Sequence, residues 1–129
     1  MKRILFSSLI FCFVCHLAFS QDRNSIWVFG DSCGIDFSSN PVPINSAMDG
    51  RGSCVSISDS TGVLQVYSAT LSYLNNDWDT RAFNVNDSIL LGCDSIAGEA
   101  WYNELIIIPN PDSISQFRLF SVGRNIGIN

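Results

Sequence analysis

The segment CVSISDSTGVLQVY, residues 54–67, combines two β-strand patterns with a turn between them. Val55 and Ile57 alternate with small polar residues, and apolar residues return in VLQVY (63–67). The four residues between the two runs, DSTG (59–62), are all turn formers. Two apolar runs joined by so short a polar connection predict an antiparallel β-hairpin.

The rest of the chain continues the β pattern. ELIIIP (104–109) reads as a buried strand, NPDS (110–113) as a break, and ISQFRLFSV (114–122) as a returning strand. We expect Pro109 and Pro111 to keep that connection out of any ladder. Residues 70–103 show no regular pattern, and no segment keeps a helical period over eleven or more residues.

We therefore predict an all-β, antiparallel fold. The expected core consists of the large apolar residues of these runs and of the apolar stretch in residues 26–37: Trp27, Phe29, Phe37, Val55, Ile57, Leu64, Val66, Leu105, Ile107, Phe117 and Leu119.

The first residues have the composition of a secretory leader. Lys2 and Arg3 precede an apolar run that ends at Val14, and small residues follow before Gln21. We predict a signal peptide over residues 1–20 and a single β domain over residues 21–129. The alternatives are a retained anchor and a lipoprotein modified at Cys15. The run is short for a membrane span, and CFVC (12–15) lacks the small residues that a lipobox carries.

The charge of residues 21–129 narrows the classes of partner. This part of the chain has all 12 acidic residues, five arginines and no lysine. Nucleic acids and anionic membranes attract clustered positive charge, so we expect neither as a partner. The acidity itself is typical of a soluble exported protein.

Three cysteines follow the predicted leader, namely Cys33, Cys54 and Cys93. An oxidising compartment permits one disulfide and leaves one thiol. The pair Cys33 and Cys54 would close the shortest loop, although spacing does not choose among the three pairings. No Cys-x-x-Cys motif or Cys/His cluster is present, so we expect no zinc site and no cofactor.

The stretch FGDS, residues 29–32, is similar to the nucleophile block of GDSL-type serine esterases, which would make Ser32 the nucleophile. Such an enzyme needs a base beside its serine. The only histidine is His16, inside the predicted leader, and no lysine follows Lys2. We therefore expect no enzymatic activity, and we interpret Asp31-Ser32 as a turn after a strand.

Four blocks in order resemble the N-terminal propeller-like region of large secreted surface proteins of gliding bacteria. That group comprises gliding-motility-associated proteins, with PKD-domain-bearing relatives, exported by a type IX-type route. The blocks are IWVFGDSCGIDFSSNPVPI, GSCVSISDSTGVLQVYS, LLG and ELIIIPNPDSISQFRLFSVG, and the resemblance covers roughly residues 25–122. Matching positions are Trp27, Phe29, Gly30, Gly34, Asp36, Phe37, Cys54, Ser56, Ile57, Ser58, Asp59, Gly62, Leu64, Tyr67, Leu90, Leu91, Gly92, Ile107, Pro109, Pro111 and Phe120.

The resemblance implies partial β-propeller blades and an extracellular adhesive or scaffold role. Residues 21–129 suffice for fewer than the four blades that a propeller needs. We therefore expect an incomplete propeller fragment, or strands that close as a small sandwich. The family's Asp-Gly and Trp-Asn motifs are replaced here by SATLSYLNNDWD (68–79).

Smaller signals suggest further sites. Asp-Ser followed by an apolar residue or threonine resembles an O-glycosylation acceptor of secreted proteins of the same bacteria, which makes Ser60, Ser88, Ser95 and Ser113 candidates. NNDWD (75–79) matches the first half of a calcium loop but lacks the glycine and the closing glutamate. Tyr73, Trp78, Trp101 and Tyr102 could form an aromatic patch for sugars or peptides, or belong to the core.

Together these observations predict a non-enzymatic structural or interaction module. We expect it to be secreted or held on the outer cell surface, with the periplasm as an alternative. Its expected partner is a protein or glycan at that surface. The alternative functions are a carbohydrate- or calcium-binding module and, less favoured, a GDSL-type esterase.

Overall fold

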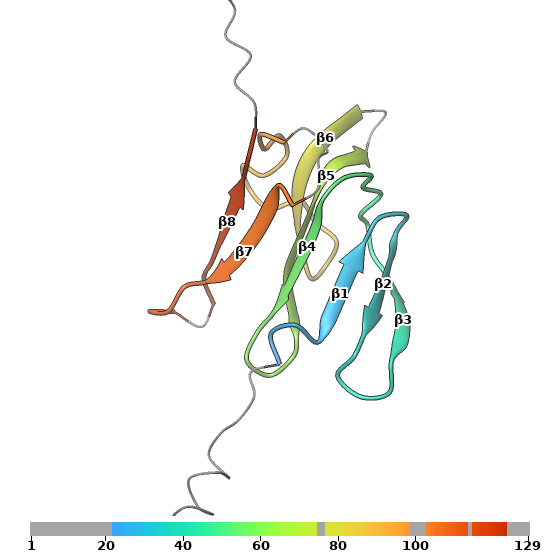
Figure 1. Cartoon of the computed structure of the whole chain (residues 1–129), viewed down its shortest axis with the longest axis vertical. Helices are drawn as coiled ribbons and strands as arrows, with labels where there is room; N and C mark the ends of the chain where they lie inside the picture. The colour runs from blue at the N-terminus through green and yellow to red at the C-terminus, as the bar shows by residue number, and fades with distance from the viewer. Residues whose placement is uncertain (1–21, 75–76, 99–102, 114, 124–129) are drawn as a thin grey trace, which may run out of the picture.

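The computed structural model describes residues 22–74, 77–98, 103–113 and 115–123, and in this part of the chain every regular element is a β-strand. The strands are β1 (Ile26–Phe29), β2 (Cys33–Asp36), β3 (Val42–Asn45), β4 (Cys54–Ser58), β5 (Leu64–Leu74), β6 (Asp77–Asn84), β7 (Leu105–Pro109) and β8 (Phe117–Ser121). All ladders are antiparallel (Figure 1). The predicted all-β, antiparallel class is confirmed.

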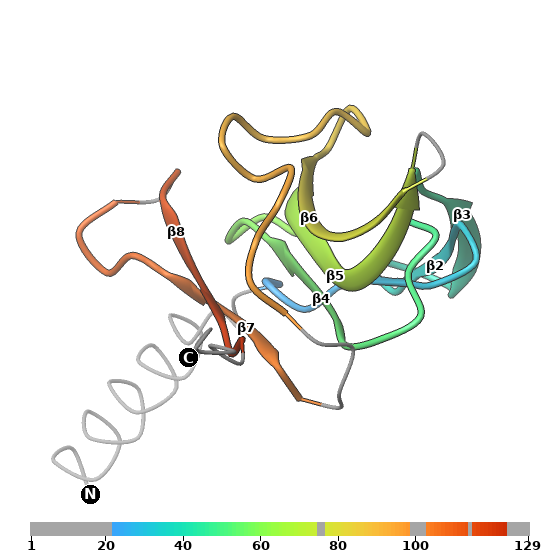
Figure 2. The ribbon, with the colours of Figure 1, turned by 90° about the horizontal axis from the view of Figure 1, so that it is seen from above.

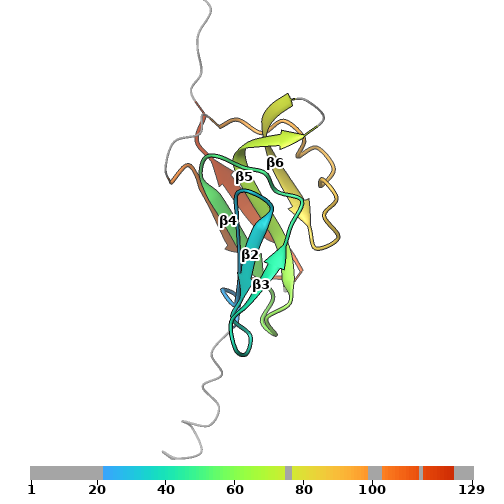
Figure 3. The same cartoon turned by 90° about the vertical axis from the view of Figure 1, so that its right-hand side faces the viewer.

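The strands form three small sheets, in the orders β1-β2-β3, β4-β5-β6 and β7-β8. The sheet β4-β5-β6 lies in the middle, with β1-β2-β3 on one side and the β7-β8 hairpin on the other (Figures 1 and 2). Figure 3 shows β2 and β3 in front of β4 and β5. These described sheets do not close into a barrel or a propeller.

Both predicted hairpins are present. β4 pairs with β5 across the turn at residues 59–62, where the Asp59 carboxylate accepts the backbone N–H groups of Thr61 and Val63. Hydrogen bonds to this carboxylate lower the pKa of Asp59. Gly62 takes a φ of 90°, a conformation that glycine adopts without strain.

Two sequence expectations about strand positions are wrong. Residues 70–103 are not irregular throughout, because β5 runs on to Leu74 and β6 occupies Asp77–Asn84. Ser68, Ala69 and Thr70 of β5 are small or polar, so a hydrophobicity pattern does not reveal the strand there, although all three residues are buried. Pro109 is also part of a ladder, opposite Phe117.

A serine hydroxyl joins β1 to the middle sheet. The β1–β2 register and the bond from the Phe37 N–H to the Ser25 carbonyl direct the backbone groups of Ile26 and Val28 away from β2. Ser56 Oγ accepts the Val28 N–H at 3.2 Å and donates to the Ile26 carbonyl at 2.8 Å. One side chain from β4 thus hydrogen-bonds the outward N–H and C=O groups at the edge of β1.

The centre of the core is Tyr67, which is fully buried on β5. Its ring stacks on Phe83 of β6 with centroids 5.1 Å apart, and Val28, Met48 and Ala69 complete the cluster. The Tyr67 hydroxyl donates to Asp87 Oδ1 at 2.5 Å and accepts the Ala47 N–H at 3.3 Å. Burial and the neighbouring Asp87 carboxylate raise the pKa of Tyr67.

The predicted core is only partly correct. Ile57 and Leu105 are buried, as expected, whereas Trp27 and Phe37 are 55 % and 41 % exposed, and Phe29 is also exposed. Strand alternation explains this error, because Val28 turns inward and its two aromatic neighbours therefore turn outward. The other predicted core residues are half-buried: Val55, Leu64, Val66, Ile107, Phe117 and Leu119.

The Ser56 bridge predicts a specific loss of stability. Ser56→Ala leaves two edge groups of β1 without their partner, which we expect to lower the free energy of unfolding by about 1–3 kcal/mol. Ser60→Ala, in the exposed 59–62 turn, is the matched control and should change it by less than about 0.5 kcal/mol. Urea unfolding measures both, and equal midpoints for the two variants would contradict the bridge.

The buried tyrosine predicts an alkaline loss of stability. An unfolded tyrosine ionises near pH 10.0, while Tyr67 in the folded chain keeps its proton to higher pH. Above pH 10 the unfolded state therefore holds fewer protons, so stability falls as pH rises. Tyr67→Phe should cost about 1–3 kcal/mol at neutral pH and flatten this fall. Urea unfolding at neutral pH and above pH 10 tests both effects, and an unchanged alkaline slope would argue against them.

Candidate functional site

Within the described residues, the outer edge of β8 pairs with no other strand. The Asn110 N–H donates to the Gln116 carbonyl, and the Val122 N–H donates to the Glu104 carbonyl. With the ladder register, these bonds place the even-numbered residues of β8 in the pairing with β7. The backbone N–H and C=O groups of Phe117, Leu119 and Ser121 therefore point away from β7.

Chain segments, a serine hydroxyl or prolines occupy parts of the other described edges. Residues 88–96 form backbone hydrogen bonds with the outer edge of β6, for example from the Leu90 N–H to the Ala82 carbonyl. On β3, the Ser46 N–H to Ser32 carbonyl bond sets a register in which Pro43 lies on the outer edge and offers no N–H. On β7, Ser53 Oγ accepts the Leu105 N–H at 3.4 Å, and Pro109 has no N–H to donate.

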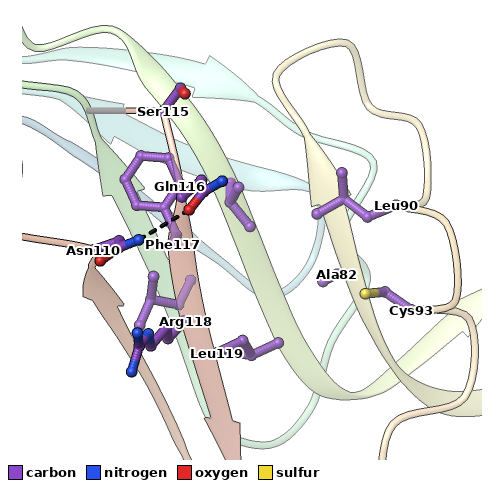
Figure 4. Close-up of a pocket in the computed structure, with 11 residues that line it drawn as sticks. Ala82, Leu90, Cys93, Asn110, Ser115, Gln116, Phe117, Arg118 and Leu119 are labelled. Carbon is purple, nitrogen blue, oxygen red and sulfur yellow. Dashed lines mark hydrogen bonds between the residues drawn. The ribbon is translucent and has the colours of Figure 1, made fainter. Parts of the chain in front are cut away.

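A groove of about 590 Å³ lies beside β8. One wall carries Ile107, Phe117 and Leu119 from the hairpin. The facing wall comes from β5, β6 and the segment after β6: Val66, Ala82, Leu90 and Cys93. Figure 4 shows Leu90 and Cys93 on the segment across from Phe117 and Leu119. We call this hollow the β8 groove.

The β8 groove is apolar along its walls and polar at one end. Asn110, Ser115 and Gln116 form the polar end, and Asn110 Nδ2 donates to Gln116 Oε1 at 2.9 Å (Figure 4). Arg118 is the one charged residue that borders the groove, and its pairing with Ile108 places its side chain on the other face of the hairpin. At the other end, Ser121 Oγ donates to the Ala97 carbonyl. The groove can therefore hold apolar groups along the edge of β8, with hydrogen-bonding groups at one end.

A second hollow of about 360 Å³ lies between β1 and β7, lined among others by Trp27, Phe29 and Ile106. Strand alternation puts Ile106, Ile108 and Phe120 on the hairpin face opposite Leu119, and all three are exposed. Trp27 also contacts Phe37 edge-on, with ring centroids 5.2 Å apart. Both faces of the β7–β8 hairpin thus present apolar surface to solvent.

The structure places Ser32 in an exposed turn between β1 and β2, not at the end of a parallel strand. Asp31 and Ser32 have φ values of 59° and 58°, the left-handed region. The Ser32 N–H donates to the Met48 carbonyl at 2.8 Å. The described strands are antiparallel, so the crossover arrangement of an α/β hydrolase is absent from this part of the chain.

The three cysteines of the described chain are free thiols. The structure therefore contains no disulfide between Cys33 and Cys54, and that pairing stays a prediction. Cys33 Sγ donates to the Gly30 carbonyl at 2.9 Å. Burial raises the pKa of the Cys54 thiol, and a hydrogen bond from the Gly30 backbone opposes this rise.

The glycosylation candidates lie in four different surface segments. Ser60, Ser88 and Ser95 are exposed, and Ser113 is half-buried with its hydroxyl 3.4 Å from that of Ser115. The structure brings none of these four together with another. Their modification stays a prediction.

The calcium-loop and aromatic-patch predictions fall mostly outside the described residues. Asn75, Asn76, Trp101 and Tyr102 are not described, nor are the side chains of Tyr73, Asp77 and Trp78. Asp79 Oδ1 accepts the Thr80 N–H at 2.8 Å. Among the described residues, no group of three or more His, Cys, Asp or Glu side chains is placed to hold a metal ion.

Sequence reasoning missed the β8 groove. It located the two strands of the hairpin, but the facing wall at Leu90 and Cys93 depends on how residues 85–98 return along β6. The alternation of Phe117 and Leu119 with Arg118 was the available signal, since it marks one apolar face of an edge strand.

The chain matches no protein-family model, no curated protein and no solved structure. Within the described residues, no helix has the length and apolar character to cross a membrane.

The surroundings of Ser32 predict that it is not a nucleophile. We expect residues 21–129 to hydrolyse p-nitrophenyl acetate at the same background rate with and without Ser32→Ala, because no histidine or lysine follows His16 to accept the proton. Release of p-nitrophenol is followed by absorbance. Turnover that disappears in Ser32→Ala would establish the esterase alternative instead.

Proposed function

We propose that this chain is a non-enzymatic interaction module that binds an extended segment of a partner protein along β8. The observation that carries the proposal is the open edge of β8, which lies directly beside an apolar groove. Parts of other described edges are covered by chain segments or carry a proline.

Backbone pairing would supply the affinity. The outward N–H and C=O groups of Phe117, Leu119 and Ser121 match the hydrogen-bonding pattern of one more strand. Adding a strand to an exposed sheet edge is a recurrent mode of peptide recognition. An open edge is otherwise a site of unwanted aggregation, which natural proteins cover or charge.

The groove would supply the specificity. Side chains of an added strand alternate between the two faces, so every second residue would face the β8 groove. The apolar walls at Phe117, Leu119 and Leu90 favour aliphatic or aromatic residues there.

The setting of this interaction is the outside of the cell. The leader pattern of residues 1–20 supports export, and the four-block resemblance supports a surface protein built of partial propeller blades. In such a protein the exposed faces of the β7–β8 hairpin would pack against further strands. We propose a secreted or surface-held module on these grounds.

A carbohydrate-binding function is the second candidate. One observation favours it: the Trp27 ring is 55 % exposed and is held edge-on by Phe37. Exposed, fixed aromatic rings can stack on sugar faces. A glycan array with wild type and Trp27→Ala separates this candidate from peptide binding, because the β8 groove does not include Trp27.

A backbone substitution on β8 tests strand addition. Leu119→Pro removes an outward N–H without removing a bond of the β7–β8 ladder. Wild-type residues 21–129 are used to select from a displayed library of random linear peptides. We expect selected peptides with alternating apolar residues, and a loss of affinity of about tenfold or more in Leu119→Pro, which equals roughly 1.4 kcal/mol.

Leu119→Ala is the matched control, because it keeps the N–H and removes only the groove side chain. It should bind with an affinity between those of wild type and Leu119→Pro. Circular dichroism and urea unfolding verify that both variants fold. If no peptide is selected, or if Leu119→Pro binds as tightly as wild type, the proposal is wrong.

A further inference from the structure

We propose that Cys33 and Cys54 are a disulfide-forming pair that connects the β1-β2-β3 sheet to the middle sheet, with Cys93 left as a free thiol. This modification site is independent of the strand-binding function. Three features support this pairing: the alignment of β4 with β1, the turn after β1 and the separate location of Cys93.

The alignment of β4 with β1 brings Cys54 to Gly30. The Ser58 N–H donates to the Arg23 carbonyl, and Ser56 Oγ bonds both Ile26 and Val28. Lower residue numbers on β4 bond to higher residue numbers on β1, so the two strands run antiparallel. One further step places Cys54 opposite Phe29, beside Gly30. The Cys54 Sγ donates to the Gly52 carbonyl at 3.6 Å, and the Gly30 backbone and the Cys33 thiol both lie close enough to influence the pKa of Cys54.

The turn after β1 brings Cys33 to the same glycine. Cys33 is the first residue of β2 and pairs with Phe29, the last residue of β1. Its Sγ donates to the Gly30 carbonyl at 2.9 Å. The two thiols, from different sheets, therefore lie near the backbone of the same residue.

Gly30 is held in place at this junction. A side chain at this position would overlap the carbonyl oxygen of Gly50, which shows how closely the two backbone segments approach. Cys33 and Cys54 are both half-buried. The meeting point of the thiols is thus a packed part of the molecule rather than a loose surface loop.

Cys93 is not a competing partner. It lies in the segment that follows β6, where its carbonyl accepts the Ala82 N–H, and it lines the β8 groove. This wall of the groove consists of β5, β6 and residues 90–93, whereas Cys33 and Cys54 lie beside Gly30. The three pairings that the sequence permits reduce to one.

The reaction is a thiol–disulfide exchange with a small disulfide such as oxidised glutathione as the oxidant. A thiolate of the pair attacks the glutathione disulfide, releases one reduced glutathione and forms a mixed disulfide. The second thiolate then attacks the protein sulfur and releases the other glutathione. The protein loses two protons and two electrons, and the oxidant gains them. The Cys33 side chain must turn from the Gly30 carbonyl towards Cys54.

Trypsin distinguishes all three pairings. Cleavage after Arg23, Arg51, Arg81 and Arg118 puts Cys33, Cys54 and Cys93 in three separate peptides, 24–51, 52–81 and 82–118. Residues 21–129 are oxidised with glutathione disulfide, blocked with an alkylating agent and digested. We expect a linked pair of peptides 24–51 and 52–81, and peptide 82–118 carrying either the alkyl group or a single glutathione.

Stability provides a second readout. Oxidation should lower the unfolding equilibrium constant of wild type and of Cys93→Ser by on the order of a hundredfold, because the bond closes a loop in the unfolded chain. The matched variants Cys33→Ser and Cys54→Ser should show no such shift on oxidation. Urea unfolding under oxidising and reducing conditions measures the change.

Several outcomes would overturn the inference. One is a linked pair that contains peptide 82–118, and another is complete alkylation of all three cysteines after oxidation. A third is an equal stability shift in Cys33→Ser and wild type. None of these outcomes bears on peptide binding at β8, so the two proposals fail separately.

Discussion

The constraint on which this structure depends is the satisfaction of strand edges in three small sheets. Each sheet has at most three strands, so edges are numerous relative to the size of the chain. Different devices deal with them: a serine hydroxyl at β1, a returning segment at β6, prolines at β3 and β7. On β8, the backbone groups of Phe117, Leu119 and Ser121 point outward and pair with no described strand, and this edge gives the molecule its candidate site.

The core is organised around one amphipathic side chain. Tyr67 is central enough to be fully buried, yet its hydroxyl reaches Asp87 and Ala47. The same residue thus packs two strands together and holds two connecting segments. Close backbone approaches, such as that of Gly30 to Gly50, let the flanking sheet come near the middle one. Side-chain burial and edge satisfaction therefore operate at the same junction.

Local patterns in the sequence were enough to predict the fold class and both hairpins. The turn residues at 59–62 and the apolar run at 105–108 are local signals, because each consists of consecutive residues. Burial was harder to predict. Trp27 and Phe29 were assigned to the core by size, but strand parity turns Val28 inward instead. Strand β6 was missed because its buried residues include Thr80, Arg81 and Ala82.

The site could be predicted only in part, for a related reason. An alternating strand at residues 117–121 indicates an apolar face, but whether its edge is free depends on every other strand. The groove wall at Leu90 and Cys93 is set by long-range pairing with β6. Propeller-like assembly, export and surface attachment depend on the resemblance and the leader pattern, and they belong to the proposal.

The central claim is that the edge of β8 is open, and amide hydrogen exchange tests it most directly. Residue-resolved exchange by NMR compares neighbouring amides of one strand under identical conditions. The account predicts fast exchange at Leu119 and Ser121, whose N–H groups point outward, and protection at Arg118 and Phe120, which pair with β7. Equal protection of Leu119 and its two neighbours would show that the edge is already covered and would contradict the account.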